Sequence, residues 1–199
     1  MYPTVEAPYG LVAVGTESGV GKFNTRHYPI ASGYGTAIFN GDVVTMVAAG
    51  TIEKETSTTT GANPLGVFVG CQYTDPVTGE PRFSPYYPGS VAADDIMAVV
   101  IDDPTMLFKV AVVSSGTTIT GVTRAAAIGA NAPLEQNAGS TVNGISKVAL
   151  DGGSIATTAG LPLRIVDGVE ETKNASGEYT ELLVYFNEHQ RQRGTAGLA

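Results

Sequence analysis

Residues 15–22 come closest to a known chemical motif, because their glycines and final lysine are spaced almost as in a phosphate-binding loop. The spacing between Gly15 and the Gly21-Lys22 pair is one residue too long for such a loop. Phe23 also stands where the motif needs a serine or threonine to hold magnesium. We therefore interpret this segment as a glycine-rich bend and expect no nucleotide site.

Histidine and cysteine are too sparse for the metal or nucleophile chemistry that they usually carry. His27 and His189 are far apart in the sequence, and neither has a second ligand-type residue at metal spacing. Cys71 lies in an apolar run without a neighbouring base, and one cysteine cannot form an internal disulfide. We interpret Cys71 as a buried hydrophobic residue and expect no metal and no cofactor.

Carboxylates occur in adjacent pairs at Asp94-Asp95, Asp102-Asp103 and Glu170-Glu171. Neighbouring residues on a strand point to opposite faces, so such pairs do not converge on one substrate. A glycosidase with two facing carboxylates stays open as a hypothesis, but the chain has no tryptophan to stack on sugars. We expect solvated turns at these pairs and predict that the protein is not an enzyme, with a small hydrolase as the weakest alternative.

The elements that would position these residues are predicted to be strands. Short β-branched and aromatic runs alternate with Asn-Gly and Gly turns, which predicts an all-β fold, an antiparallel β-barrel or sandwich. Strands are expected at residues 11–14, 42–47, 51–54, 65–73, 82–87, 96–101, 106–113, 161–166 and 180–187. A single helical turn is expected after Thr123, ending at Gly129.

The chain is predicted to divide into an extended N-terminal arm (1–35), a β-barrel body (36–187) and a polar C-terminal tail (188–199). Prolines and glycines prevent long regular elements in the arm, and its charges cancel. Its aromatic rings cannot be buried within so short a segment. Two placements stay open: the arm wraps its own barrel, or it reaches a neighbouring subunit.

Partner contact is predicted for aromatic and basic residues of the arm, because such side chains dominate interface hot spots. The candidates are Tyr9, Phe23, Arg26, His27 and Tyr28. On this hypothesis, deleting residues 1–35 leaves a folded body that no longer binds its partner.

Charge limits the partners that we expect. The 199 residues include 11 basic and 19 acidic ones, a formal net charge of −8 that repels nucleic-acid phosphates and anionic membranes. The N-terminus lacks the basic and apolar regions of a signal peptide, and the apolar runs are too short to span a bilayer. We therefore expect no nucleic-acid or membrane partner, and synthesis in a cytoplasm.

The turn-and-strand segments resemble structural proteins of tailed bacteriophages, and among them the capsid decoration (cement) proteins. The resemblance rests on Phe39-Asn-Gly-Asp-Val-Val, Gly50-Thr-Ile, Pro64-Leu-Gly-Val-Phe-Val-Gly-Cys and Tyr73-Thr-Asp-Pro-Val-Thr-Gly, with the closing segments Leu161-Pro-Leu-Arg-Ile-Val and Val184-Tyr-Phe-Asn-Glu-His-Gln. It spans residues 26–190 and implies a β-barrel body, often trimeric, with an extended terminus on the shell.

The resemblance also implies a function and a location. Such a protein binds the outer surface of the phage head and stabilises the capsid by bridging major capsid protein subunits. It would be a homotrimer on the exterior of the virion, made in the host cytoplasm, with no catalytic residues. The alternative is a receptor- or glycan-binding β-module of a phage fibre, with an aromatic pocket at Tyr86 and Tyr87. Long repeats or coiled-coil stalks typical of fibres are not visible in the sequence.

Overall fold

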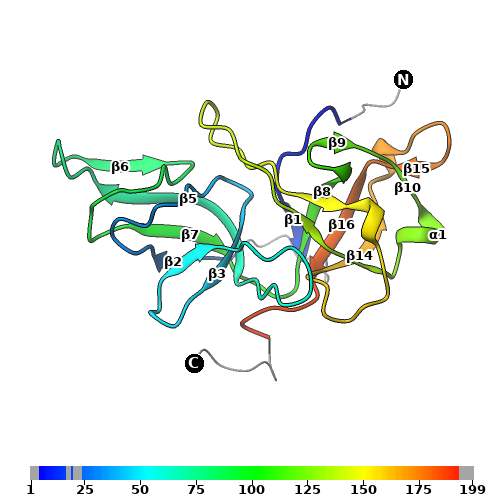
Figure 1. The fold of residues 1–199 in the computed structure, drawn as a ribbon, viewed down its shortest axis with the longest axis horizontal. Helices are drawn as coiled ribbons and strands as arrows, with labels where there is room; N and C mark the ends of the chain where they lie inside the picture. The colour runs from blue at the N-terminus through cyan, green and yellow to red at the C-terminus, as the bar shows by residue number, and fades with distance from the viewer. Residues whose placement is uncertain (1–4, 17–18, 20–23, 193–199) are drawn as a thin grey trace.

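A computed structural model describes residues 5–16, 19 and 24–192, which form two β-lobes side by side (Figure 1). The prediction of an all-β fold is confirmed. A six-stranded sheet forms the smaller lobe, and an eight-stranded sheet with a separate two-stranded one forms the larger lobe. Most strand pairs are antiparallel, and among the described residues no sheet closes into a barrel. The architecture therefore corresponds to the sandwich alternative.

The smaller lobe has its strands in the order β2, β7, β5, β3 and β4, and β6 pairs with the far part of β5. These strands are β2 (Thr25–Pro29), β3 (Val43–Met46), β4 (Ile52–Lys54), β5 (Gly66–Thr74), β6 (Pro81–Ser84) and β7 (Met97–Ile101). The predicted strands between residues 42 and 101 are therefore confirmed to within a few residues. The strand β2 was not predicted from the sequence.

The larger lobe is centred on the long strand β8 (Met106–Ser115), which pairs with β16 (Glu181–Phe186), β1 (Val12–Thr16), β9 (Thr118–Ile119) and, in parallel, β13 (Ala149–Asp151). The sheet also contains β11 (Asn131–Ala132), β12 (Leu134–Glu135) and β14 (Leu163–Gly168). The separate pair is β10 (Val122–Thr123) with β15 (Glu178–Tyr179). The predicted helical turn is α1 (Arg124–Ala127), and two 3-10 turns are η1 (Gly152–Ser154) and η2 (Glu170–Thr172).

Each lobe has its own hydrophobic core, and strand β7 takes part in both. Ala98 and Val100 point to one face of the smaller sheet, where loop residues such as Ile38 and Tyr87 cover them. We call this the inner face. Ile101 points to the opposite, outer face and packs in the core of the larger lobe. The two cores therefore meet at the end of β7, and the remainder of the outer face lies outside both.

The predicted arm, residues 1–35, is extended in its described part, but it is paired with the body. Strand β1 pairs with β8, and β2 pairs with β7. An extended chain satisfies its backbone hydrogen-bonding groups by adding to sheet edges, and here it adds to one edge in each lobe. Of the two placements that the sequence left open, the described residues adopt contact with their own subunit. Deleting residues 1–35 would remove two strands, so a folded remnant is no longer expected.

The predicted polar tail is described as far as residue 192, and this part is packed on the smaller lobe. His189 is 1% exposed, and the side chain of Gln190 bonds to the backbone of Met46. Arg191 contacts the carboxylate of Asp102. Within the described ranges, none of the helices has the length or the hydropathy of a membrane span.

Candidate docking surface

The outer face of the smaller sheet carries a row of side chains from four neighbouring strands. Strand register places Pro29 beside Met97, Met97 beside Gln72, and Gln72 beside Phe83. Phe83 is 79% exposed, Pro29 is also exposed, and Met97 and Gln72 are half-buried. The row therefore runs from the edge strand β2 to the edge strand β6 across a surface that no described segment covers fully.

The next residues along this face have the same character. Side chains alternate between the faces of a strand, so His27 on β2 and Val99 on β7 share the outer face with the row. His27 is exposed and Val99 is half-buried. None of these side chains is a carboxylate, a lysine or an arginine, although the chain carries a net charge of −8. Aromatic and methionine side chains are typical of the centre of a protein interface, and the charged side chains of Arg82 and Asp95 lie at the Phe83 end of the row.

A hollow of about 200 Å³ continues this surface where the two lobes meet. Val69 and Ile101 of the smaller sheet form one wall, and residues at the beginning of β1 form the other. Figure 1 shows β1 at this junction. On β1, Val12 is 44% and Val14 is 45% exposed. We define the docking surface as Val12, Val14, His27, Pro29, Val69, Gln72, Phe83, Met97, Val99 and Ile101.

A bulge in β5 shapes the docking surface at the hollow between the two lobes. The register of β5 on β7 shifts between Phe68 and Gly70, which leaves Val69 as the extra residue. A bulge bends its strand and increases its twist. A side chain at Gly70 would place its Cβ 3.0 Å from the carbonyl oxygen of Ser84, so the glycine allows the close approach of β6. Val69 consequently lies in the hollow instead of in the ladder of the sheet.

Two of the predicted contact residues, Arg26 and Tyr28, lie on the inner face and meet at Asp102. The Tyr28 hydroxyl donates a hydrogen bond to Oδ2 of Asp102 at 2.5 Å, and Nη1 of Arg191 donates to the same oxygen at 2.5 Å. The Nε of Arg26 lies 3.6 Å from it. Asp102 is only 1% exposed, so these donors compensate a buried charge. Burial and the bond to the Asp102 carboxylate raise the pKa of Tyr28 to about 12.

The other predicted contact residues lie elsewhere. His27 belongs to the docking surface, and Phe23 lies outside the described residues. Tyr9 is anchored on the larger lobe, where its hydroxyl donates to Glu181 and its ring lies 5.4 Å from the ammonium of Lys109. Burial, followed by the bond to Glu181, raises the pKa of Tyr9 far above its ordinary value. The structure therefore joins Arg26 with Tyr28 and separates both from His27 and Tyr9.

Comparison with known proteins finds no matching family model, no matching curated protein and no matching solved structure. The functional argument accordingly rests on the chemistry of the surface. The most exposed ring of this surface, Phe83, was missed by sequence reasoning. Its strand was predicted, but strand alternation does not tell which face the loops will cover.

The aromatic pocket predicted at Tyr86 and Tyr87 does not form. Tyr87 is fully buried in the core of the smaller lobe. Tyr86 stacks on Phe39, with ring centroids 5.5 Å apart. An exposed aromatic ring lies instead at Phe83, where a shallow hollow of about 160 Å³ is also lined by Gln72, Arg82 and Asp95.

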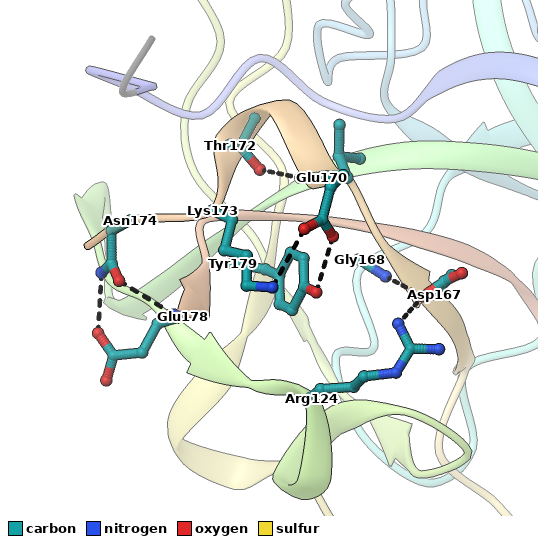
Figure 2. A network of polar contacts seen from close by, with 10 residues as sticks. Arg124, Asp167, Gly168, Glu170, Thr172, Lys173, Asn174, Glu178 and Tyr179 are labelled. Atoms are coloured by element: carbon teal, nitrogen blue, oxygen red, sulfur yellow. Dashed lines mark hydrogen bonds and ion pairs between the residues drawn. The ribbon is translucent and has the colours of Figure 1, made fainter. Parts of the chain in front are cut away.

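A second polar cluster lies at the far end of the larger lobe and is satisfied internally (Figure 2). The Glu170 carboxylate accepts hydrogen bonds from Lys173 at 3.1 Å and from the Tyr179 hydroxyl at 2.9 Å. The bond from Lys173, followed by that from Tyr179, lowers the pKa of Glu170. Arg124 bonds to Asp167 at 2.7 Å, which ties α1 to the end of β14. These contacts hold the loop at residues 167–179 in place.

Proposed function

We propose that this protein is a virion structural protein that binds the outer surface of a phage head and stabilises the capsid by bridging major capsid protein subunits. The observation that carries the proposal is the docking surface, a partly apolar set of side chains without Asp, Glu, Lys or Arg on a chain of net charge −8, with Arg82, Asp95 and Lys109 at its margins. Such a face suits burial against another protein. The acidic remainder disfavours contact with packaged DNA and favours the exterior of the shell.

The shape of the surface supports bridging. It covers two walls, the outer face of the smaller sheet and the exposed side of β1 on the larger lobe, with the hollow between them. One partner segment seated in the corner and another on the flat face would both contact the same molecule. Opening the shell would then require both contacts to break. Assembly as a homotrimer, which is part of the proposal, would multiply weak contacts through effective concentration.

The proposal is tested by adding the purified protein to genome-filled heads that lack it. We expect saturable binding in a fixed ratio to the major capsid protein, and release of DNA at a higher temperature than from bare heads. Light scattering of the free protein should give the mass of a trimer. Binding restricted to a few copies at the tail, without any effect on DNA release, would contradict the proposal.

A receptor- or glycan-binding module of a fibre is the second candidate function, and the hollow at Phe83 favours it. An exposed ring beside the side chains of Gln72, Arg82 and Asp95 combines a stacking surface with groups that bond to hydroxyls. The carboxylate of Asp95 is already held by the backbone N–H and the hydroxyl of Thr74. A glycan array separates the two functions: saccharide binding that is lost in Phe83→Ala supports the fibre module.

A further inference from the structure

Strand β2 lies at an edge of the smaller sheet, and within residues 5–16, 19 and 24–192 no strand pairs with its outer side, which we call the open edge. The Ile30 N–H donates to the Ile96 carbonyl, and the register of β2 on β7 then pairs Tyr28 and Arg26 with β7 through backbone hydrogen bonds. The backbone N–H and C=O groups of Thr25 and His27 therefore point away from the sheet. Pro29 has the same outward orientation but no N–H, so the part of the edge that can pair fully is short.

A pocket of about 430 Å³ lies beside the beginning of this edge. Its wall includes Asn24, Thr25 and Arg26 on one side, and Asp102, Asp103 and Arg191 on the other. Among the described residues, no hydrogen bond uses the Asn24 amide, the Thr25 hydroxyl, the Nη groups of Arg26, or Nη2 of Arg191. The pocket therefore offers several unused donors.

The acceptors of the pocket are used in part within the protein, since Oδ1 of Asp102 is buried and has no hydrogen-bond partner among the described residues. Oδ2 of Asp102 is bound by Tyr28 and Arg191, and Oδ1 of Asp103 accepts from the backbone N–H and the hydroxyl of Thr105. By holding Arg191 and drawing Arg26 to 3.6 Å, Asp102 fixes two guanidinium groups at one pocket. Two arginines against two aspartates give no net charge, so a carboxylate bound here would be held by directed hydrogen bonds from the unused Nη groups.

We propose that the open edge of β2 and the pocket beside it bind an extended peptide segment whose Asp or Glu side chain places its carboxylate between Arg26 and Arg191. A strand added to this edge bonds to the outward groups of Thr25 and His27. Its residue opposite Arg26 points to the same face as Arg26, toward the pocket. Because the pairing edge is short, the carboxylate supplies much of the selectivity. The inference holds whether the partner is a capsid protein or another chain.

The test uses the isolated, nitrogen-15-labelled protein and three probes: the end-blocked peptide Ser-Thr-Val-Glu-Val-Thr-Ser, the same peptide with Gln in place of Glu, and acetate. We expect the Glu peptide to shift the amide resonances of Thr25 and His27 and to bind about tenfold more tightly than the Gln peptide. Equal binding of the two peptides, or no shift at Thr25 and His27, would overturn the inference. So would acetate shifting the arginine signals while neither peptide binds.

Two variants test separately how the peptide carboxylate and the pairing with the edge of β2 contribute to binding. Arg26 is 59% exposed in its side chain, so Arg26→Gln should leave the fold intact and abolish the preference for Glu over Gln. Thr25→Pro removes an outward N–H, as Pro29 already does in the sequence, and should weaken both peptides. Arg82→Gln, an arginine on β6, should change neither. A retained Glu preference in Arg26→Gln, or unchanged binding in Thr25→Pro, would contradict the proposal. Because no capsid is involved, these outcomes are independent of the head-binding experiment.

Discussion

Phe83 on β6 lies directly opposite Gln72 on β5, and 79% of it is exposed on the outer face of the smaller sheet. The neighbouring pair, Tyr73 and Arg82, points to the inner face, where Tyr73 packs against the core. Position along the strand thus separates residues that hold the lobe together from residues available to a partner. A substitution at Phe83 should change the surface without disturbing the core.

The stability of the smaller lobe should depend on the charge of Asp102. In Asp102→Asn, Arg26 and Arg191 lose their buried counterion, and the chain at residues 189–192 loses one of its attachments to the smaller lobe. We expect the free energy of unfolding to fall by about 2 kcal/mol in urea titrations. Asp94→Asn, at an exposed position, should change it by less than about 0.5 kcal/mol. Equal effects of the two variants would show that the cluster is not important for stability.

His189 should make the protein less stable in mild acid. Burial lowers its pKa to about 4, and Nδ1 accepts a hydrogen bond from the Arg191 N–H. Nearby charges shift the pKa of His189 in opposite directions, because Asp102 and Asp103 raise it and Arg191 lowers it. The unfolded chain, with an ordinary histidine pKa of about 6.5, binds the proton first. The contribution of neutral His189 to the free energy of unfolding is therefore complete above about pH 6.5, and it is lost as the pH falls toward 4.

The variant His189→Gln isolates this contribution from the titration of the carboxylates. We expect the difference in unfolding free energy between wild type and variant to be constant above pH 7 and to shrink as the pH falls from about 6.5 toward 4. Urea titrations at several pH values measure it. A difference that does not depend on pH would contradict the buried, neutral state of His189.

The N-terminal segment should tolerate no side chain at Gly10. Its φ is +84°, and a Cβ there would lie 2.7 Å from the Gly41 carbonyl oxygen and 2.7 Å from Cβ of Ser146. Gly33 has a similar φ of +74° but faces open space. Gly33→Ala should cost about 1 kcal/mol of backbone strain. Gly10→Ala should cost clearly more, and equal costs would show that residues 5–16 are not seated on the body.

Much of the fold follows from local patterns, but the pairing of strands does not. The runs that became β5, β7 and β8 are visible in the sequence because β-branched residues alternate between turns. Strand β2 was missed, since Arg26, His27 and Pro29 give no such pattern, and it is a strand only because β7 offers a free edge. The contact between Tyr9 and Glu181 joins positions 172 residues apart, which no local signal reveals.

The candidate site was predictable only in part. His27 was selected as a contact residue of an extended arm, and it lies on the docking surface as part of a paired strand. Phe83 and Met97 were not selected, because the identity of the exposed face depends on which loops cover the other face. That cover is formed by irregular segments containing Ile38 and Tyr87, whose sequences have no periodicity to read.

The most direct test of the docking surface compares the affinity of Phe83→Asp and Ala126→Asp for heads that lack the protein. Both variants add one negative charge at an exposed position, the first on the outer face and the second in α1 at the far end of the larger lobe (Figure 1). Placing a charge in a desolvated interface should weaken binding by at least about tenfold in Phe83→Asp. Ala126→Asp should bind like the wild type. Equal affinity of Phe83→Asp and wild type would contradict the docking surface.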